Sequence, residues 1–380
     1  MICTEKLPVP PIRGGAIQTY IAGALPHLSL SHQVTVIGRE DPDLPAEEVR
    51  GGIRHIRVEA GRSPWVYGAN VADVLAGERF DVLHMFNRPL LVPLFAAQAP
   101  DSALVLSLHN EMLAPEKISA DSGARVVDRL DRIVTISDFV RYRSRERFPA
   151  AGAKARTIYS AADTDQFLPR WDPQARAGAA EMRAALGLGD RPVVLYVGRL
   201  SAKKGAHVVI EAVRRLQRER YGTALVVVGS KWYGRDDDPD PYIEGLHEAA
   251  ARLDPPALFT GYVPYTDVHR YFWLADVFVC ASQWREPLSR TLFEAMAAGA
   301  PIVTTDRGGN AEVVDGWRNG VVLPDVGYDQ PGAMARTIGR LLRHPDRAQR
   351  MGRIGRMLAV ERYNWPRVAR DIEAVYRGLL

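Results

Sequence analysis

The chain has few of the features that mark secreted or membrane-spanning proteins. Only two of its 380 residues are cysteines, so a disulfide framework is excluded, and we expect Cys3 and Cys280 to be buried free thiols. No uninterrupted apolar run reaches about 18 residues, so we expect no membrane-spanning helix. The start of the chain lacks a basic region followed by an apolar run, which argues against a secretion signal and for a cytoplasmic protein.

The chain also lacks a strong charge of either sign. Its net charge of +4 and pI near 9.0 give a mild attraction to anions, which suits a phosphorylated substrate or an anionic membrane surface. The charge is too weak to indicate nucleic acid. Arg141, Arg143, Arg145 and Arg147 alternate along the sequence, so we interpret them as a solvated surface. No G-x-G-x-x-G pattern follows an expected strand, which argues against an oxidoreductase.

What the chain does contain is an alternation of short apolar segments and helical patterns, over a length that suits two domains. This alternation predicts an α/β fold with parallel sheets covered on both faces. Residues 170–190, which are rich in Ala, Arg and Gly, are expected to connect the domains. The expected strands are residues 1–4, 34–37, 53–58, 82–86, 104–108, 133–136, 154–159, 193–197, 224–229, 275–282 and 301–305.

Residues 283–312 contain the densest group of candidate functional residues. Proline disfavours a helical conformation in the residue before it, so Pro287 predicts that Glu286 lies in a loop. Glu294 is expected on the helix that follows, so both carboxylates can face one pocket. Helix formers continue to Ala298, and Gly299 is a natural helix stop.

Two glycine-containing turns are candidates for anion binding. After residues 193–197, Arg199 and Lys204 place two cations near the start of a helix, which is a pyrophosphate site in physical terms. Gly14 and Gly15 form a similar turn before an expected helix, although close packing of helix on sheet explains these two glycines equally well.

Other polar residues follow expected strands or lie in acidic runs. His109 comes directly after residues 104–108, at a strand end of the kind where open α/β sheets bind ligands; a structural hydrogen-bonding histidine is the alternative. Asp163 and Asp165 form a D-x-D pattern whose surroundings do not support metal binding. We interpret residues 236–238, three aspartates, as a solvated loop. No metal site is expected.

The motif letters resemble glycosyltransferase family 4, whose members are retaining enzymes with the GT-B architecture of two Rossmann-like domains. The resemblance rests on E-x7-E from Glu286 to Glu294, on the flanking E-A-M-A-A-G-A-P-I-V-T-T and G-G-N-A-E, and on G-R-x4-K-G around Arg199 and Lys204. It extends from about Arg13 to the end of the chain. Several segments are similar to the spore coat protein SA type of member. Leu288 and Ser289 replace the usual phenylalanine and glycine, which leaves the sugar open.

The resemblance implies a domain organisation and a set of site residues. Residues 1–170 would form the acceptor-side domain, 171–190 the linker, 191–362 the domain that binds the nucleotide sugar, and 363–380 a helix that crosses back to the first domain. The implied catalytic residues are Glu286, His109, Arg199 and Lys204. The implied donor-binding residues are Gly14, Gly15, Arg199, Lys204, Gly229, Val263, Glu286, Leu288, Ser289, Arg290 and Glu294.

The implied reaction is transfer of a sugar from a nucleotide diphosphate sugar, with UDP expected first and GDP next. It would proceed with retention, by a front-side mechanism, and without metal or cofactor. The acceptor is open among polysaccharide, lipid, protein and small molecule, and contact with a membrane surface or spore coat fits the charge and the resemblance. The alternatives are a GT-B-like epimerase and a catalytically silent sugar- or coat-binding protein. A phosphorylase is disfavoured because no lysine has a pyridoxal phosphate context.

Overall fold

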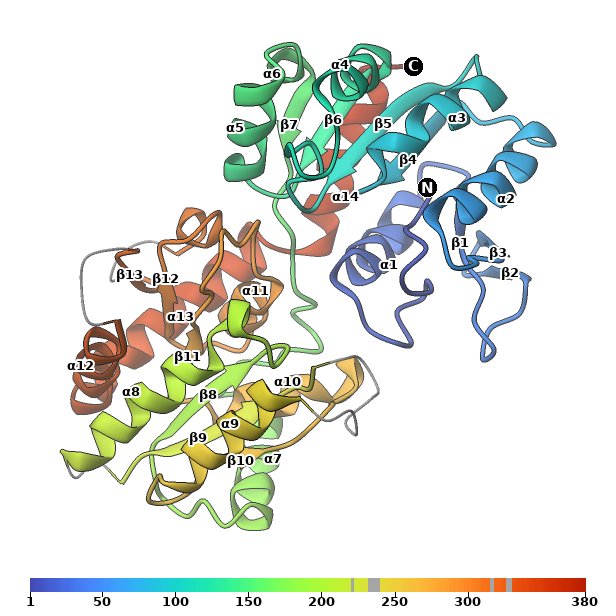
Figure 1. Ribbon diagram of the computed structural model, residues 1–380. Coiled ribbons are helices and arrows are strands. Elements are labelled where there is room, and N and C mark those ends of the chain that lie inside the picture. Colours follow the sequence, from blue (N-terminus) through green and yellow to red (C-terminus); the bar gives the residue numbers. More distant parts are fainter. Residues whose placement is uncertain (220–221, 232–239, 315–317, 326–329) are drawn as a thin grey trace. The chain divides into compact units, whose positions relative to one another are not determined.

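The computed structural model describes residues 1–219, 222–231, 240–314, 318–325 and 330–380, which form two compact units (Figure 1). Unit 1 comprises Met1–Ser160 and Trp365–Leu380, and unit 2 comprises Ala161–Asn364. The division therefore falls after Ser160, ten residues before the boundary expected from the sequence. Because the last helix belongs to unit 1, the chain passes between the units twice.

Unit 1 contains a mostly parallel sheet in which a single residue joins two groups of strands. Ile2 forms parallel bridges to Ile37 and to Met85, and so joins the two ladders β2-β3-β1 and β4-β5-β6-β7. The expected first strand is thus this bridging residue. The strands are β1 (Thr35–Arg39), β2 (Glu47–Arg50), β3 (Ile53–Val58), β4 (Val82–Phe86), β5 (Ala103–Leu108), β6 (Arg132–Thr135) and β7 (Ala155–Thr157).

The helices of unit 1 pack in neighbouring pairs. The C-terminal helix α14 lies against α1, where the indole of Trp365 covers Gly23 so closely that a Cβ there would lie 2.3 Å from the ring. Helix α2 packs against α3, and α3 against α4. The helices are α1 (Ala16–Leu28), α2 (Pro64–Ala76), η1 (Pro89–Leu91), α3 (Val92–Gln98), α4 (Ala120–Arg129), α5 (Asp138–Arg147), α6 (Ala151–Lys154) and α14 (Trp365–Arg377).

Two arginines of α5 do more than face solvent, contrary to the expectation from their alternation. Arg143 and Arg147 lie one helical turn apart, and the guanidinium Nε of Arg143 donates to Glu111 Oε2 at 3.0 Å. Arg147 donates to the backbone oxygens of Leu113 and Ile118, the latter at 2.6 Å. These side chains fasten the loop after β5 to α5, so the solvated-surface interpretation is wrong for both.

Unit 2 contains a fully parallel sheet of six strands in the order β10-β9-β8-β11-β12-β13. The chain builds outward from β8 to β10 and then returns to the other side of β8 with β11. Strand order therefore reverses between β8 and β11, which is the point where open α/β sheets bind ligands. The strands are β8 (Val193–Val197), β9 (Ala224–Val228), β10 (Leu258–Phe259), β11 (Val277–Cys280), β12 (Ile302–Thr305) and β13 (Gly320–Leu323).

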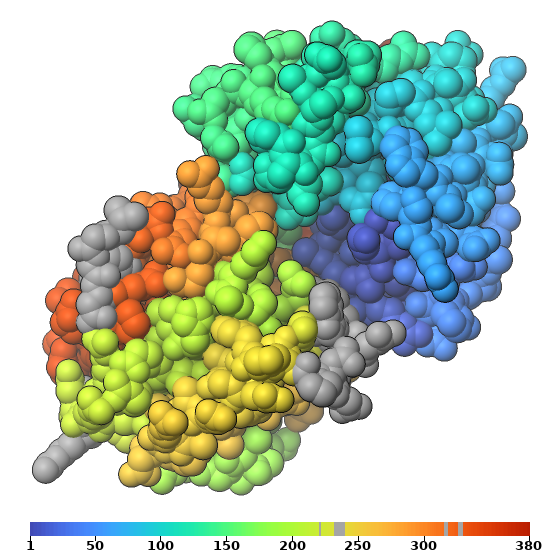
Figure 2. All heavy atoms as spheres, viewed as in Figure 1, coloured from blue at the N-terminus to red at the C-terminus, as the bar shows by residue number. Residues whose placement is uncertain are grey.

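The helices of unit 2 form two groups. In one group α8 packs against α9 and α12, and in the other α7 packs against α10 and α11 against α13. Helices α8 and α9, yellow-green and yellow, form part of the face visible in Figure 2. The helices are α7 (Pro173–Ala185), η2 (Ala202–Lys204), α8 (Ala206–Arg218), α9 (Pro241–Ala251), α10 (Tyr265–Leu274), α11 (Arg290–Ala297), η3 (Asn310–Glu312), α12 (Gln330–Arg343) and α13 (Pro345–Glu361).

Helix α7 occupies the segment that the sequence indicated as a linker. Asp172 caps it by accepting a hydrogen bond from the Gln174 amide at 2.8 Å, and Pro173 suits its first turn. Its alanine-rich sequence buries little beyond Ala175, so no apolar stripe marks it as a helix of the domain.

Several other expectations have plain outcomes. Cys3 and Cys280 are buried free thiols, as predicted. Among the helices of the described ranges, none is both long and apolar enough to cross a membrane. The three aspartates at 236–238 lie outside the described residues.

Substitution by alanine is expected to have opposite effects on stability at two helical glycines of unit 2. A Cβ at Gly352 would lie 2.1 Å from the backbone oxygen of Gly299, whereas a Cβ at Gly245 would meet nothing within 4 Å. We expect Gly352→Ala to destabilise the protein by about 1–3 kcal/mol through overpacking. Gly245→Ala should stabilise it by about 0.5–1 kcal/mol because alanine favours the helix. Urea denaturation measures both changes, and a native-like Gly352→Ala protein would contradict the packing of α13.

Candidate active site

The loop after β8 delivers two basic residues to the reversal point of the sheet. Arg199 follows β8 with an exposed guanidinium, and Lys204 ends η2 directly before α8. Between η2 and α8, Gly205 has a φ of +76°, and a Cβ there would lie 1.9 Å from the backbone oxygen of Ala281. Only glycine allows this approach, which brings the start of α8 against the end of β11.

The loop after β11 places Glu286 beside these cations. Its Oε2 accepts hydrogen bonds from Lys204 Nζ at 2.6 Å, from Trp284 Nε1 at 2.8 Å and from Ser282 Oγ at 3.0 Å. The Glu286 side chain is 7% exposed and that of Lys204 is 21% exposed. Within the described residues, the other carboxylate oxygen of Glu286 makes no hydrogen bond. The hydrogen-bonding capacity of that second oxygen is therefore unused by the described residues.

The loop after β12 holds the backbone of Glu286 in place. Gly309 donates its amide to the Glu286 carbonyl at 2.8 Å, and Gly308 has a φ of +70°. A Cβ on Gly308 would lie 1.9 Å from that same carbonyl oxygen. Gly308 thus allows two stretches of the protein's own backbone to approach closely.

Glu294 lies in α11, one turn from its start, and is buried. Its Oε1 is 3.2 Å from Arg290 Nη1, yet this buried oxygen has no hydrogen bond of acceptable geometry to any described residue. Burial raises the pKa of Glu294, and the nearby positive charge of Arg290 only partly opposes the rise. The guanidinium of Arg290 also lies over the ring of Tyr265, 4.4 Å from its centroid. Glu294 is a buried carboxyl group poorly provided with donors.

The remaining unit 2 residues predicted from the sequence lie at the same edge of the sheet. Gly229, after β9, donates its amide to Gly261 at 3.0 Å, and Val263 is half-buried after β10. The amide of Ser289 is already donated to Asn310 Oδ1 at 2.9 Å. Leu288 is half-buried in the loop before α11. The structure thus groups all nine unit 2 residues near the carboxyl ends of the strands, with the Ser289 amide occupied internally.

The other three predicted residues belong to unit 1. Gly14 and Gly15 have φ values of 81° and 105°, and Gly15 forms the N-terminus of α1 without a side-chain cap. His109 follows β5 and packs edge-on against Tyr20, with 4.7 Å between ring centroids. Burial lowers the pKa of His109 to about 3, so its imidazole is neutral near pH 7. It is suited to hydrogen bonding rather than to proton transfer.

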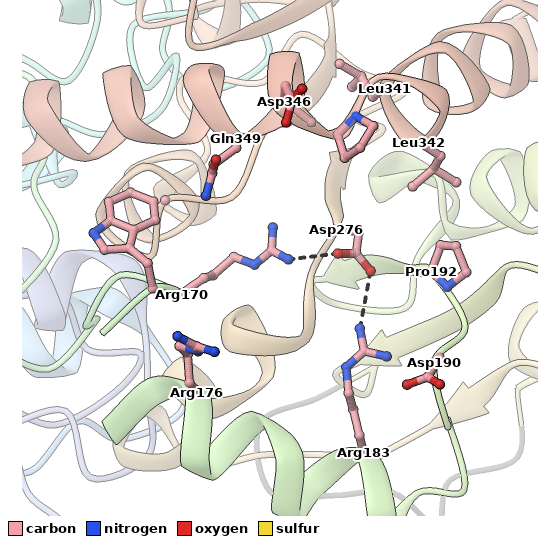
Figure 3. Close-up of a pocket in the computed structure, with 14 residues that line it drawn as sticks. Arg170, Arg176, Arg183, Asp190, Pro192, Asp276, Leu341, Leu342, Asp346 and Gln349 are labelled. Carbon is pink, nitrogen blue, oxygen red and sulfur yellow. Dashed lines mark hydrogen bonds and ion pairs between the residues drawn. The ribbon is translucent and has the colours of Figure 1, made fainter. Parts of the chain in front are cut away.

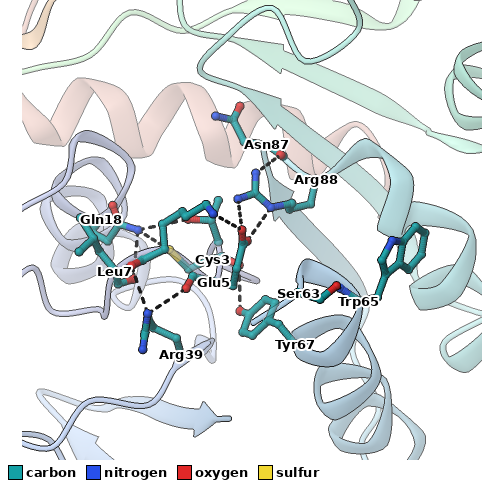
Figure 4. Close-up of polar contacts among 12 residues, drawn as sticks. Cys3, Glu5, Leu7, Gln18, Arg39, Ser63, Trp65, Tyr67, Asn87 and Arg88 are labelled. Carbon is teal, nitrogen blue, oxygen red and sulfur yellow. Dashed lines mark hydrogen bonds and ion pairs between the residues drawn. The ribbon is translucent and has the colours of Figure 1, made fainter. Parts of the chain in front are cut away.

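An ion pair at the reversal point of the unit 1 sheet was missed from the sequence (Figure 4). Arg88, after β4, donates two hydrogen bonds of 2.6 Å to the buried carboxylate of Glu5, just beyond the bridge at Ile2. Burial opposes ionisation of Glu5, but the bonds and charge of Arg88 outweigh it and lower the pKa of Glu5. Next to Arg88, Asn87 accepts the His109 amide at 2.7 Å. The available signal was that each residue directly follows a strand.

The raised pKa of Glu294 predicts a pH-dependent effect of Glu294→Gln. Because the folded state holds the proton more tightly than the unfolded chain, ionisation of Glu294 subtracts stability as pH rises from its usual pKa near 4.5. We expect the stability of Glu294→Gln relative to the native protein to increase between about pH 4 and neutral pH. Urea midpoints at several pH values measure this difference.

Glu211 provides a control of opposite sign. Hydrogen bonds and charge from Arg214 and Arg215 lower its pKa to about 2. Its contribution to stability is therefore present above the unfolded pKa and is lost as pH falls. Glu211→Gln should be less stable than the native protein at neutral pH and converge with it in acid. A Glu294→Gln difference with the same pH trend as Glu211→Gln would contradict the burial argument.

Comparison with known protein families gives one match for each unit. Residues 17–166 match the family Glycosyltransferase Family 4, and residues 179–357 match Glycosyl transferases group 1. Spore coat protein SA of Bacillus subtilis is 40% identical over 376 residues, which cover 99% of this chain and 98% of that protein. A mannosyltransferase of Mycolicibacterium smegmatis, named as GDP-mannose-dependent and acting on phosphatidylinositol monomannoside, is 32% identical over 94% of this chain and 93% of its own length.

Solved structures agree on the fold. The Anabaena protein HepE, crystallised in complex with UDP-glucose, aligns with a TM-score of 0.76 at 19% identity and covers 99% of both chains. The two α/β units with parallel sheets match the expected architecture. The motifs, the family matches and the 40% identity over nearly the whole chain agree. The chain therefore belongs to glycosyltransferase family 4 and is a glycosyltransferase with the GT-B fold.

Proposed function

We propose that this glycosyltransferase moves a sugar from a nucleotide diphosphate sugar to an acceptor, with retention of configuration and without a metal ion. The observation that carries the proposal is the group of Arg199, Lys204 and Glu286 at the reversal point of the unit 2 sheet. As the bond from the sugar to the diphosphate breaks, the leaving group gains negative charge. Two cations and the N-terminus of α8 are suited to stabilise that charge.

Glu294 is proposed to bind the ribose of the donor. A carboxylate accepts two hydrogen bonds from the neighbouring hydroxyls of a diol. The buried Oε1 of Glu294 has no hydrogen bond among the described residues, so ribose hydroxyls would supply the missing donors. Burial of this carboxylate without a ligand costs stability, and binding of the ribose would offset that cost.

Glu286 and Lys204 are proposed to act on the sugar and the diphosphate. The oxygen of Glu286 that accepts three hydrogen bonds fixes the carboxylate, while the second oxygen is available to a hydroxyl of the donor sugar. Lys204 lies between this carboxylate and the start of α8, within reach of a phosphate bound at the helix N-terminus. Gly229, Val263, Leu288, Ser289 and Arg290 are proposed to complete the donor-binding loops.

In the proposed front-side mechanism, the hydroxyl oxygen of the acceptor bonds to the anomeric carbon on the face from which the diphosphate leaves. The departing phosphate oxygen takes the proton of the acceptor, so no general base from the protein is required. Neutral His109 is proposed to donate a hydrogen bond to the donor sugar or to the acceptor. Gly14 and Gly15 are proposed to contact the donor phosphates through their backbone.

Relatives support a choice of donors to test first. HepE was crystallised with UDP-glucose, and the mycobacterial mannosyltransferase is named as GDP-mannose-dependent. We propose UDP-sugars first and GDP-sugars second, with a hexose as the transferred group. The similarity to spore coat protein SA supports a role connected with the spore surface, for a protein that we propose is cytoplasmic or peripheral to a membrane. The acceptor is open among polysaccharide, lipid, protein and small molecule.

Adjacent lysines of η2 provide a matched test of the donor site. Lys204 bonds to Glu286, whereas Lys203 is exposed and lies 5.4 Å from the ring centroid of Trp284. We expect Lys204→Ala to lower turnover about 100-fold or more, because a positioned charge that stabilises the leaving group is lost. Lys203→Ala should retain near-native turnover. The assay follows nucleoside diphosphate released from a nucleotide sugar that the native protein uses.

The same assay on other variants shows where the proposal fails. Arg199→Ala and Glu294→Ala should also lose turnover while circular dichroism and thermal unfolding show a folded protein. Near-native turnover in folded Glu294→Ala would refute the assignment of the ribose site. Equal losses in Lys203→Ala and Lys204→Ala would indicate a general charge effect rather than a specific contact.

A further inference from the structure

Unit 2 contains a cavity of about 660 Å³ at the edge of its sheet opposite to the active site (Figure 3). Pro192, Asp276 and Gly299 line it, and these residues precede β8, β11 and β12. Arg199 and Glu286, in contrast, follow β8 and β11. Because these strands are parallel, the two sets of residues lie at opposite edges of the sheet. The cavity is therefore separate from the active site of unit 2.

One wall of the cavity carries three guanidinium groups. Helix α7 contributes Arg176 and Arg183, which are seven positions apart and so share a face of the helix. Arg170 precedes the helix. Arg170 and Arg183 both bind Asp276, at 2.8 and 3.3 Å, and the Val193 amide donates to the same carboxylate at 2.8 Å. Asp276 thus pairs with two of the three cations and holds them in place, and Asp190 adds a second carboxylate to the lining.

Arg170 has an unused donor within this wall. Its Nε atom is buried and has no hydrogen-bond acceptor among the described residues, although its Nη2 is bonded to Asp276. Figure 3 shows the Arg170 side chain extended across the cavity toward Asp276. A buried N–H without an acceptor costs free energy, so an acceptor supplied by a ligand would be favourable here.

The facing wall has a different chemistry. It is formed by the start of α13, with Asp346 and Gln349. The N-cap residue of this helix, His344, makes no side-chain hydrogen bond to it. Leu341 and Leu342 add an apolar surface. Carboxylate and amide oxygens accept hydrogen bonds from hydroxyls, whereas they repel a bare anion. A ligand that matches both walls carries an anionic group at one end and hydroxyls at the other.

We propose that this cavity is a second ligand site, which binds a small sugar phosphate. The phosphate would lie against Arg170, Arg176 and Arg183, because guanidinium groups bind phosphate oxygens in pairs. The hydroxyls would face Asp346 and Gln349. The volume lies within the range of about 300–1,000 Å³ that is usual for small-molecule sites. The site does not depend on the identity of the donor bound at the opposite edge.

Both walls of the cavity belong to stretches of unit 2 that lead toward the places where the chain passes between the units. Arg170 lies shortly after Ala161, where unit 2 begins, and α13 ends shortly before Asn364, where unit 2 ends. On α13, Arg356 ties the two segments together by donating to the backbone oxygens of Thr164 and Phe167, at 3.0 and 2.8 Å. A ligand that bridges the two walls would contact the stretch around Arg170 and the start of α13, which are far apart in the sequence.

Calorimetric titration of the whole chain with glucose 1-phosphate and glucose 6-phosphate tests the proposal. Saturating UDP is present to occupy the active site, and glucose serves as the uncharged control. At least one sugar phosphate should bind while glucose does not. Arg176 is exposed and outside the Asp276 network, so Arg176→Glu should fold normally and weaken sugar phosphate binding about tenfold or more. Arg218→Glu, on α8, makes the same charge change away from the cavity and should leave binding unchanged.

Amide hydrogen exchange locates the bound ligand. We expect slower exchange in residues 170–183 and 345–349 when sugar phosphate is added. Absence of binding by both sugar phosphates would overturn the proposal, as would protection confined to residues 198–205 and 286–294. Nucleotide affinity measured on Arg176→Glu should match that of the native protein. Nucleotide binding alone tests the donor site, and sugar phosphate binding tests the second site. Failure of one site is thereby distinguished from failure of the other.

Discussion

The proposed donor-binding end of unit 2 depends on how one buried carboxylate oxygen, Oε2 of Glu286, is satisfied. Three donors from two loops meet there: Lys204 after β8, and Ser282 and Trp284 after β11. A buried charge is tolerated only when it is paired and hydrogen-bonded, so loss of one donor would release the loops that the carboxylate ties together. Gly309 fixes the backbone of Glu286 from a third loop. The geometry is therefore set before any ligand binds, which is the condition for electrostatic stabilisation of a leaving group.

The two glutamates of the E-x7-E motif differ in the hydrogen-bond donors that surround them. Glu286 has three donors, whereas one oxygen of the buried Glu294 has no hydrogen bond among the described residues, and the pKa of Glu294 is raised. A protein selected for stability alone would place an apolar or amide side chain at position 294. An unsatisfied buried carboxyl is instead what we expect where a ligand supplies the missing donors. This contrast supports separate roles, with Glu286 fixed by the protein and Glu294 completed by the nucleotide.

From the sequence we could predict functional residues that directly follow a strand. We could not predict contacts that depend on which strands are neighbours in the sheet. Arg199, Lys204 and Glu286 could be predicted as neighbours because the motifs and the strand-end rule place them together. The pair Glu5–Arg88 could not, because no motif marks either residue and the two meet only through the bridge formed by Ile2. Strand β2 was missed because it is a mostly exposed edge strand without alternation of apolar residues. Helix α7 was taken for a linker because alanine-rich helices bury little apolar surface.

Incubation of the purified protein with UDP-, GDP-, ADP- and TDP-sugars in the presence of a metal chelator tests the proposed retaining sugar transfer most directly. Free nucleoside diphosphate is measured, and the anomeric form of the released or transferred sugar is followed by NMR. We expect that one α-linked donor is turned over and that the sugar first appears as the α-anomer. A β-anomer from an α-linked donor would contradict retention. No turnover of any donor, with nucleotide binding also absent, would contradict the proposed donor site itself.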